Sequence, residues 1–143
     1  MATTMEGSKV INGTFGRLWF NDQELANVKS FEAKVKYKYE DLDISEQMGK
    51  SRKIAGFEVS GTAVLHKVDS TVAKLISDDL KKGKQPVLKM VARVADPSSE
   101  GQERVQITGI TVDELTLLKF EMKKIGEEEI PFEAEDYEYL EQI

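Results

Sequence analysis

The side chains that most often carry out chemistry are sparse in this chain. His66 is the only histidine, and there is no cysteine. This removes most catalytic triads, all disulfides and thiolate metal sites, and nearly all imidazole metal sites. As a lone residue on the polar side of an expected strand, His66 is interpreted as structural. The sequence offers no set of a nucleophile, a general base and a residue that orients the base. We therefore expect no catalytic residues and no enzyme activity.

Three acidic residues in the segment "DLDISE" are spaced like part of a calcium-binding loop. Asp41, Asp43 and Glu46 supply oxygen ligands of the kind that calcium prefers. The third oxygen position and the glycine that such a loop requires are both missing. We therefore expect no metal-binding residues.

The run Met48–Ser51, "MGKS", resembles the end of a phosphate-binding loop. That pattern needs a further glycine five residues earlier, where this chain has Ile44. The surroundings also lack the strand-to-helix connection that places phosphate at a helix N-terminus. We therefore expect no cofactor-binding residues and no cofactor, and interpret the basic cluster of Lys50, Arg52 and Lys53 as a contact surface.

Lysine and tyrosine alternate within "VKSFEAKVKYKY", Val28–Tyr39. From Phe31 onward the apolar residues share one parity and the charged residues the other, which predicts a strand with one buried face. Cations beside aromatic rings are typical of sheets that bind nucleic acid. Here, however, Tyr37 and Tyr39 point to the face opposite Lys36 and Lys38. We therefore expect these tyrosines in the core and no nucleic-acid binding by this strand.

The formal net charge of −6 arises at the C-terminal end of the chain. Of its 26 acids, eight lie after residue 126, a segment without lysine or arginine, which leaves 18 acids against 20 bases before it. Such a run indicates a solvated face or a disordered tail. Apolar residues are interleaved with the acids, however, and "IPFEAEDYEYL" reads as a strand with an acidic outer side. We place this acidic C-terminal strand at about 127–141.

The remaining elements are mostly strands separated by turn residues. "GTFGRLWFNDQEL" predicts a small hairpin that turns at Asn21-Asp22. "FEVSGTAVLHKV" predicts a strand that pairs with the strand ending at Tyr39, with Lys38 opposite Glu58 and opposed residue numbers that sum to an even value. Further strands are expected at 86–95, 103–112 and 115–122. Between the two long strands, a polar loop at about 41–55 is expected.

The segment "DSTVAKLISDDLKKGKQP" predicts the one helix. Asp69 or Ser70 can cap its first turn, Gly83 suits a left-handed residue after its end, and Pro86 prevents its continuation. One apolar stripe along it consists of Val72, Leu75, Ile76 and Leu80. This helix is expected to pack on a sheet.

These elements indicate a mainly β fold of the α+β class: a β-sandwich or distorted barrel of about seven to eight antiparallel strands with one packed helix. A length of 143 residues suits one domain, 1–143, with an N-terminal arm at about 1–14. The first residues lack the pattern of a secretory signal, and no apolar run is long enough to cross a bilayer. We expect synthesis in the cytoplasm and no membrane anchor.

Several segments together resemble the tail tube proteins of PBSX-like prophages with contractile tails. They are "GRLWFNDQELANVKSFEAKV", "QMGKSRKIAG" leading into "GTAVLHKV", "LKKGKQP", "ERVQITGI" and "EEEIPFEAEDYEYLE". The resemblance runs from Gly13 to about Glu141 in the same order and spacing. It departs at Asn21-Asp22, where a turn that contains glycine is more usual.

The resemblance implies a structural virion protein with the tail-tube fold. Its homohexameric rings would stack into the inner tube of a contractile phage tail, a conduit for the tape measure protein and for DNA. Implied partners are copies of the same chain and the tail sheath, tape measure, baseplate and tail terminator proteins. The inner tube of a genome-free R-type bacteriocin is an alternative, and a monomeric ligand-binding β-barrel is a distant one.

The bore of such a tube places a condition on the charges of the predicted strand. Lysines repeated around a ring would bind DNA rather than let it slide, because each phosphate contact adds a counterion-release term. We therefore expect Lys34, Lys36 and Lys38 to lie outside the bore or to be offset by cross-strand acids, with Glu32, Glu40 and Glu58 as the candidates.

Overall fold

A computed structural model describes residues 7–9, 13, 16–46, 48–68, 71–98 and 101–142. Within these ranges nine β-strands and one α-helix are present, together with a short 3-10 helix, η1 (Gly7–Lys9). The strands are β1 (Gly16–Phe20), β2 (Gln23–Glu24), β3 (Val28–Leu42), β4 (Ser51–His66), β5 (Lys89–Val94), β6 (Glu103–Thr108), β7 (Thr111–Val112), β8 (Glu127–Ala134) and β9 (Asp136–Glu141). The helix α1 spans Thr71–Lys81.

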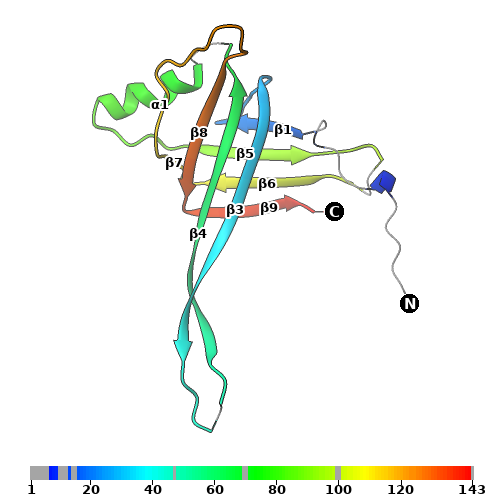
Figure 1. Cartoon of the computed structure of the whole chain (residues 1–143), viewed down its shortest axis with the longest axis vertical. Coiled ribbons are helices and arrows are strands. Elements are labelled where there is room, and N and C mark those ends of the chain that lie inside the picture. The colour runs from blue at the N-terminus through cyan, green and yellow to red at the C-terminus, as the bar shows by residue number, and fades with distance from the viewer. Residues whose placement is uncertain are drawn as a thin grey trace.

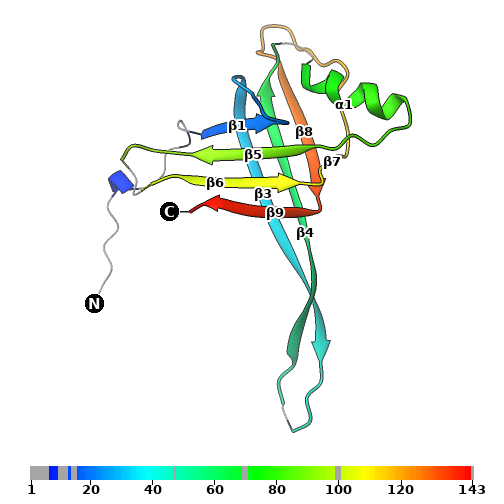
Figure 2. The ribbon, with the colours of Figure 1, turned by 180° about the vertical axis from the view of Figure 1, so that it is seen from behind.

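The strands form two antiparallel sheets packed face to face. One sheet has the order β2-β1-β5-β6-β9 and the other the order β3-β4-β8-β7. Figures 1 and 2 show the strands of one sheet running across those of the other, as in an orthogonal sandwich. The expected fold class, a β-sandwich with one helix, is confirmed. Helix α1 lies beside the upper ends of β4 and β8.

The core lies between the two sheets and under α1. Its buried side chains are Leu18, Phe20, Val59, Ala63, Leu65, Val72, Ile76, Leu88, Met90, Ile107, Ile110, Ile130 and Phe132. Phe31 stacks on Phe132 with ring centroids 6.1 Å apart. Gly61 is the closest approach in this layer, because a Cβ there would lie 2.2 Å from the Glu32 carbonyl oxygen.

The β1–β2 turn explains why asparagine can stand where a glycine is more usual. Asn21 and Asp22 have φ values of 49° and 68°, and positive φ at both central residues is what a type I′ hairpin turn requires. The Asn21 side-chain oxygen accepts a hydrogen bond from the Lys89 backbone N–H at 2.9 Å, and the Asn21 N–H donates to the Lys89 carbonyl at 3.0 Å. Asparagine therefore makes the turn and also ties it to β5.

The predicted helix is present with shorter bounds, Thr71–Lys81. Val72 and Ile76 are buried as expected, whereas Leu75 and Leu80 are about half exposed. Gly83 has φ 78°, which confirms the left-handed residue after the helix. The proposed caps, Asp69 and Ser70, lie outside the described residues.

The polar loop predicted at 41–55 is wrong in extent. β3 continues to Leu42 and β4 begins at Ser51, so the connection is only 43–50. The apolar pattern fades here because neither face of this ribbon packs on the other sheet, and burial therefore imposes no period. Of the predicted N-terminal arm at 1–14, only residues 7–9 and 13 lie within the described ranges.

Three further strand predictions were wrong. Two of the predicted strands run across corners where the chain passes from one sheet to the other, and the third falls in a loop. The predicted strand 103–112 is two strands, β6 and β7, in different sheets, with Gly109 at φ 65° between them. The acidic strand 127–141 is likewise divided into β8 and β9. The two corners meet, since the Glu135 N–H donates to the Thr108 carbonyl at 3.2 Å. The segment predicted as a strand at 115–122 contains no strand.

Candidate assembly surfaces

The long β3–β4 hairpin leaves the body of the molecule beyond Val59. β4 pairs with β8 only from Val59 to His66, whereas its pairing with β3 continues to Ser51 opposite Leu42. Residues 36–58, here called the arm, form a two-stranded ribbon that projects from the sandwich (Figure 1). An isolated two-stranded ribbon is only marginally stable in water, and its open edges invite pairing. The arm is therefore a candidate contact element.

The arm carries large apolar side chains that the monomer leaves half exposed. These are Tyr37, Tyr39, Leu42, Ile44, Ile54 and Phe57, with exposed fractions between 42% and 54%. The prediction that Tyr37 and Tyr39 lie in the core was wrong, because the opposite sheet ends before the strand does. A contact that covered the arm would bury these side chains.

Aromatic side chains brace the root of the arm against β9. The hydroxyls of Tyr37 and Tyr137 lie 3.2 Å apart. Tyr137 also meets Phe57 edge-on at 5.8 Å and Tyr139 edge-on at 6.0 Å between ring centroids, a favourable geometry for aromatic pairs. The hydrogen bond with Tyr37, followed by burial, raises the pKa of Tyr137 above 10.0. These contacts tie the direction of the arm to the other sheet.

The lysines of β3 lie beside acids. Lys38 Nζ is 2.7 Å from Glu58 Oε1, and its hydrogen bond and charge lower the pKa of Glu58 from 4.5. The register differs from the predicted one, because Glu58 lies directly opposite Lys36, so the Lys38 ion pair is diagonal. Opposed numbers do sum to an even value from Ser30 to Lys38.

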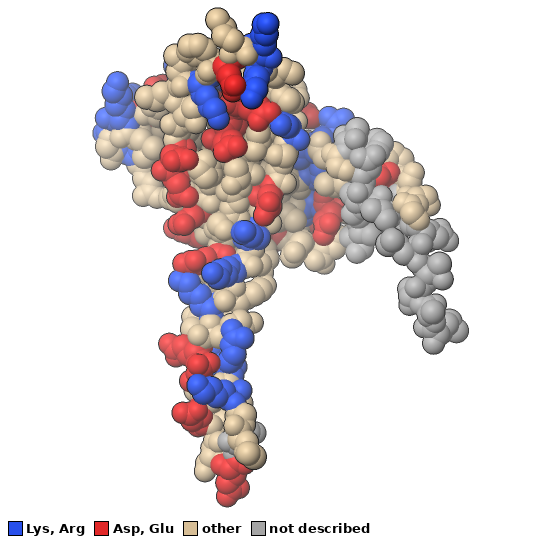
Figure 3. All heavy atoms as spheres, in the orientation of Figure 1, with Lys and Arg blue, Asp and Glu red and all other residues tan. Residues whose placement is uncertain are grey.

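A second, weaker pair joins Lys34 Nζ to Glu32 Oε1 at 3.9 Å. Beyond the bulge at Lys38/Tyr39, two of the three residues in the basic cluster interpreted as a contact surface lie opposite acids. Arg52 lies opposite Asp41, with its guanidinium 4.1 Å from the centroid of the Tyr39 ring, and Lys53 lies opposite Glu40. Figure 3 shows both signs of charge interspersed along the arm.

The connection from β7 to β8, residues 113–126, is here called the apolar loop. It gathers five large apolar side chains that are each 78–88% exposed: Leu117, Leu118, Phe120, Met122 and Ile125. Patches of this kind mark interaction sites. In Figure 1 this loop, in orange, lies at the end of the molecule opposite the tip of the arm.

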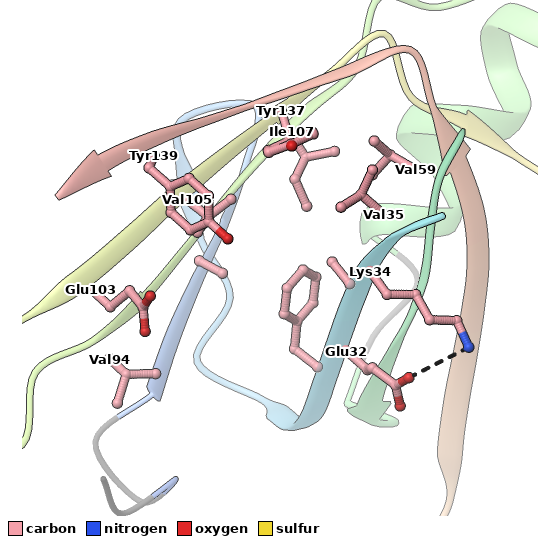
Figure 4. A pocket seen from close by; sticks show the side chains of 13 residues that line it. Glu32, Lys34, Val35, Val59, Val94, Glu103, Val105, Ile107, Tyr137 and Tyr139 are labelled. Atoms are coloured by element: carbon pink, nitrogen blue, oxygen red, sulfur yellow. Dashed lines mark ion pairs between the residues drawn. The ribbon is translucent and has the colours of Figure 1, made fainter. Parts of the chain in front are cut away.

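The sandwich is open on one side, where a cleft of about 430 Å³ separates β3 from β5, β6 and β9. Figure 4 shows Val35 and Val59 on one wall and Val105, Ile107, Tyr137 and Tyr139 on the other. Glu32 and Lys34 lie at its rim. Most of the lining is apolar, and its charged members are Glu32, Lys34 and Glu103.

The carboxylates that were compared with a calcium loop lie at or near the tip of the arm. Asp41 lies on β3, and Asp43 and Glu46 lie in the connection at the arm tip. No group of three His, Cys, Asp or Glu side chains that could hold a metal ion occurs in the described part of the chain. The described residues also include no helix long and apolar enough to cross a membrane. The expectations of no catalytic, metal or cofactor residues stay predictions.

His66 ends β4 and is held through its backbone. Its N–H donates to the Asn27 carbonyl at 2.7 Å, and the Asn27 side-chain amide donates to the His66 carbonyl at 2.7 Å. These bonds fix the turn before β3 to the end of β4. They account for the position of His66 without a role for its imidazole.

Comparisons with known proteins identify one family and a relative that matches over nearly the whole chain. Residues 3–141 match the family described as phage tail tube protein. The Phage-like element PBSX protein XkdM of Bacillus subtilis (strain 168) is 31% identical over 141 residues, which cover 97% of this chain and 96% of that protein.

Two solved assemblies contain chains of the same fold. A chain from the sheath-tube complex of the extracellular contractile injection system PVC, in its extended state, has a TM-score of 0.70 at 9% identity and covers 95% of this chain and 98% of its own. A chain from the anti-feeding prophage cap, described as a tube terminating cap, has a TM-score of 0.70 at 8% identity and covers 97% and 93%.

Proposed function

Because the chain belongs to the phage tail tube protein family, we propose that its copies assemble into hexameric rings that stack as the inner tube of a contractile phage tail. In this proposal residues 1–143 act as one tail tube domain without catalytic role, cofactor or membrane anchor, located in the virion tail. The observation that carries it is the arm, a projecting ribbon whose large apolar side chains are half exposed and would be buried by contact with another copy.

Ring closure needs a head-to-tail interface, and therefore two different complementary surfaces on each copy. The four-stranded sheet offers an edge on each side. Among the described residues no strand pairs with the outer side of β3. On the other edge, β7 pairs with only Phe132 and Glu133 of β8. If β3 of one copy pairs with β8 of the next, both open edges disappear and the ring gains a continuous wall.

Stacking of rings needs a second interface along the tube. The arm and the apolar loop lie at opposite ends of the longest axis (Figure 1). The arm of a copy in one ring can therefore contact the apolar loop of a copy in the next ring. The exposed Phe120 and Leu118 of the loop would be buried there with the half-exposed side chains of the arm, which gives the contact a hydrophobic driving force.

The charge condition on the bore favours the four-stranded sheet as its lining. The outer face of that sheet carries acids on β8, at Glu129 and Glu133, beside the offset lysines of β3. The outer face of the five-stranded sheet carries arginines on three neighbouring strands. An arginine-lined bore would hold DNA, whereas a neutral or acidic one lets it pass.

The partners in this proposal are copies of the chain and the sheath, tape measure, baseplate and terminator proteins, and DNA passes through without specific binding. The family and the fold shared with the sheath-tube complex support a place inside a sheath. The likeness to injection-system chains keeps a genome-free bacteriocin tube as the alternative; capsid proteins in the purified particle would exclude it. A ligand-binding barrel fits poorly, since the apolar cleft is open on one side.

Negative-stain microscopy with light scattering over a range of protein concentrations tests the proposal. The full chain should form rings or tubes as its concentration rises. A variant in which residues 40–53 are replaced by Asn-Gly keeps Tyr39 opposite Ile54 and closes the ribbon with a two-residue turn. It should fold, because the removed residues lie beyond the body, but it should not stack. Tubes of normal length from this variant, or monomers of the full chain at every concentration, would contradict the proposal.

A further inference from the structure

Three arginines form a row across the outer face of the five-stranded sheet. Arg17 of β1 lies directly opposite Arg93 of β5, and Arg93 lies directly opposite Arg104 of β6. Neighbours along these strands, among them Leu18 and Ile107, are buried in the core. Because side chains alternate along a strand, the three arginines point away from the core.

The row is only partly neutralised. Arg17 Nη1 lies 2.7 Å from Glu24 Oε1, and Arg104 Nη1 lies 4.0 Å from Glu141 Oε1. Arg93, between them, makes no ion pair or hydrogen bond through its guanidinium with any residue in the described ranges. The Nε atoms of Arg93 and Arg104 are also buried, and no acceptor for either lies in the part of the chain that the structure describes. Like charges placed directly opposite destabilise a sheet, and buried donors without acceptors add to that cost.

We propose that this row, centred on Arg93, is a docking site for an acidic segment of the sheath protein. The inference rests on the proposed function, in which the outer face of the five-stranded sheet points away from the bore. A carboxylate above Arg93 would accept two parallel hydrogen bonds from the guanidinium and would relieve the repulsion between the three arginines.

The shape and composition of the surface favour a protein segment. Arg17, Trp19 and Arg93 line a surface hollow of about 650 Å³. Arginine and tryptophan are the residues enriched at the energetic centres of protein interfaces. A peptide can place one carboxylate in this hollow and an apolar side chain against Trp19.

The extent of the row argues against nucleic acid. Neighbouring strands are about 4.8 Å apart, so the row spans about 10 Å, enough for one or two carboxylates. Carboxylates bound it at both ends, at Glu24 and Glu141. Glu138, opposite Gln106, adds another acid on the same face. A polyphosphate chain that continued beyond the row would meet these acids.

Binding of a fluorescein-labelled decaglutamate peptide, measured by anisotropy at low salt, tests the inference. Four forms of the unassembled subunit are compared: wild type, Arg93→Gln, Arg93→Lys and Lys74→Gln. Lys74 is exposed on α1, so its variant changes the net charge as Arg93→Gln does but leaves the row intact. A labelled oligonucleotide of ten thymidines is the second probe.

Arg93→Gln should weaken decaglutamate binding about tenfold, in line with a lost charge-assisted pair. Arg93→Lys should show an intermediate loss, because lysine keeps the charge without the planar fork. Lys74→Gln should change the affinity less than about twofold, as expected for a distant exposed charge. Equal effects of Arg93→Gln and Lys74→Gln would overturn the inference. Tighter binding of the oligonucleotide, lost in Arg93→Gln, would reassign the face to nucleic acid.

Assembly is scored separately. Wild-type and Arg93→Gln subunits should both form tubes, and wild-type tubes should still bind the peptide. Tubes that no longer bind it would place the row between copies and overturn the sheath assignment. If no tubes form while the peptide binds through Arg93, the tube proposal fails and the carboxylate site remains.

Discussion

Tyr37 and Tyr137 lie 100 positions apart in the chain, and their hydroxyl oxygens are 3.2 Å apart. Tyr37 belongs to the arm, and Tyr137 belongs to β9 of the other sheet. This hydrogen bond and the edge-on contact of Phe57 with Tyr137 join the arm to the five-stranded sheet. They lie near Val59, where the pairing of β4 with β8 ends. The direction of the arm is thus set by a contact between the sheets.

Tyr137→Phe should increase the motion of the arm without unfolding the body, because the ring contacts remain and only the hydroxyl bond is lost. The measurement is hydrogen–deuterium exchange, in which arm amides should exchange faster while β5 amides are unchanged. Tyr139→Phe is the matched control, since the described structure gives its hydroxyl no hydrogen bond. Equal exchange in the arm for Tyr137→Phe and wild type would show that the bond does not restrain it.

Gly61→Ala should destabilise the sandwich strongly. The added Cβ would lie 2.2 Å from the Glu32 carbonyl oxygen and 2.7 Å from Cζ of Phe132, so both the β3 backbone and the core would have to move. Overpacking of this kind costs about 3 kcal/mol. Gly56→Ala on the same strand has no heavy atom within 4 Å of its new Cβ and should leave the urea unfolding midpoint nearly unchanged. Similar midpoints for the two variants would contradict the close approach of Gly61 to the β3 backbone and to Phe132.

The sequence predicted the parts of the fold that the monomer buries. Alternation from Phe31 to Val35 and from Val59 to Leu65 marks strands with one face in the core, and the turn residues Asn21-Asp22 marked the first hairpin. In these segments one face is buried, so apolar and polar residues alternate, and the strand can be inferred from that alternation.

The arm and the apolar loop could not be predicted in the same way. Leu117 and Leu118 are adjacent and both exposed, so they follow neither a strand nor a helix period, although apolar residues ordinarily indicate burial. The division of the acidic segment at Glu135 depends on contact with the Gly109 corner, a tertiary relationship without a local signal. The arginine row was missed because it requires the pairing order of β1, β5 and β6.

Acidification should weaken the ion pairs on the four-stranded sheet. Hydrogen bonds from Lys38 and Lys29 lower the pKa values of Glu58 and Glu127 from 4.5. A carboxyl group with a lowered folded-state pKa contributes stability above its unfolded-state pKa and loses it as the pH falls through the folded-state pKa. The urea midpoint should therefore hold from about pH 7 to 5 and decline below pH 4.5, modestly because both groups are exposed and screened.

The double variant Glu58→Gln, Glu127→Gln separates these two pairs from the other acids of the chain. Its urea midpoint should depend less on pH below 4.5 than that of wild type. Added salt should reduce the difference between the two proteins. An identical pH dependence in both would show that neither pair contributes.

Replacing Leu118 and Phe120 together by serine should impair assembly without harming the subunit. Both side chains are 78% exposed in the monomer, so the urea midpoint should not fall. If assembly buries them, each contributes about 1.5–3 kcal/mol to the contact, and the concentration needed for tube formation should rise at least about tenfold. Sedimentation of tubes over a concentration series measures this. Val87→Ser, at an exposed apolar residue outside the loop, should assemble like wild type. If the double variant did so too, the apolar loop would have no part in stacking.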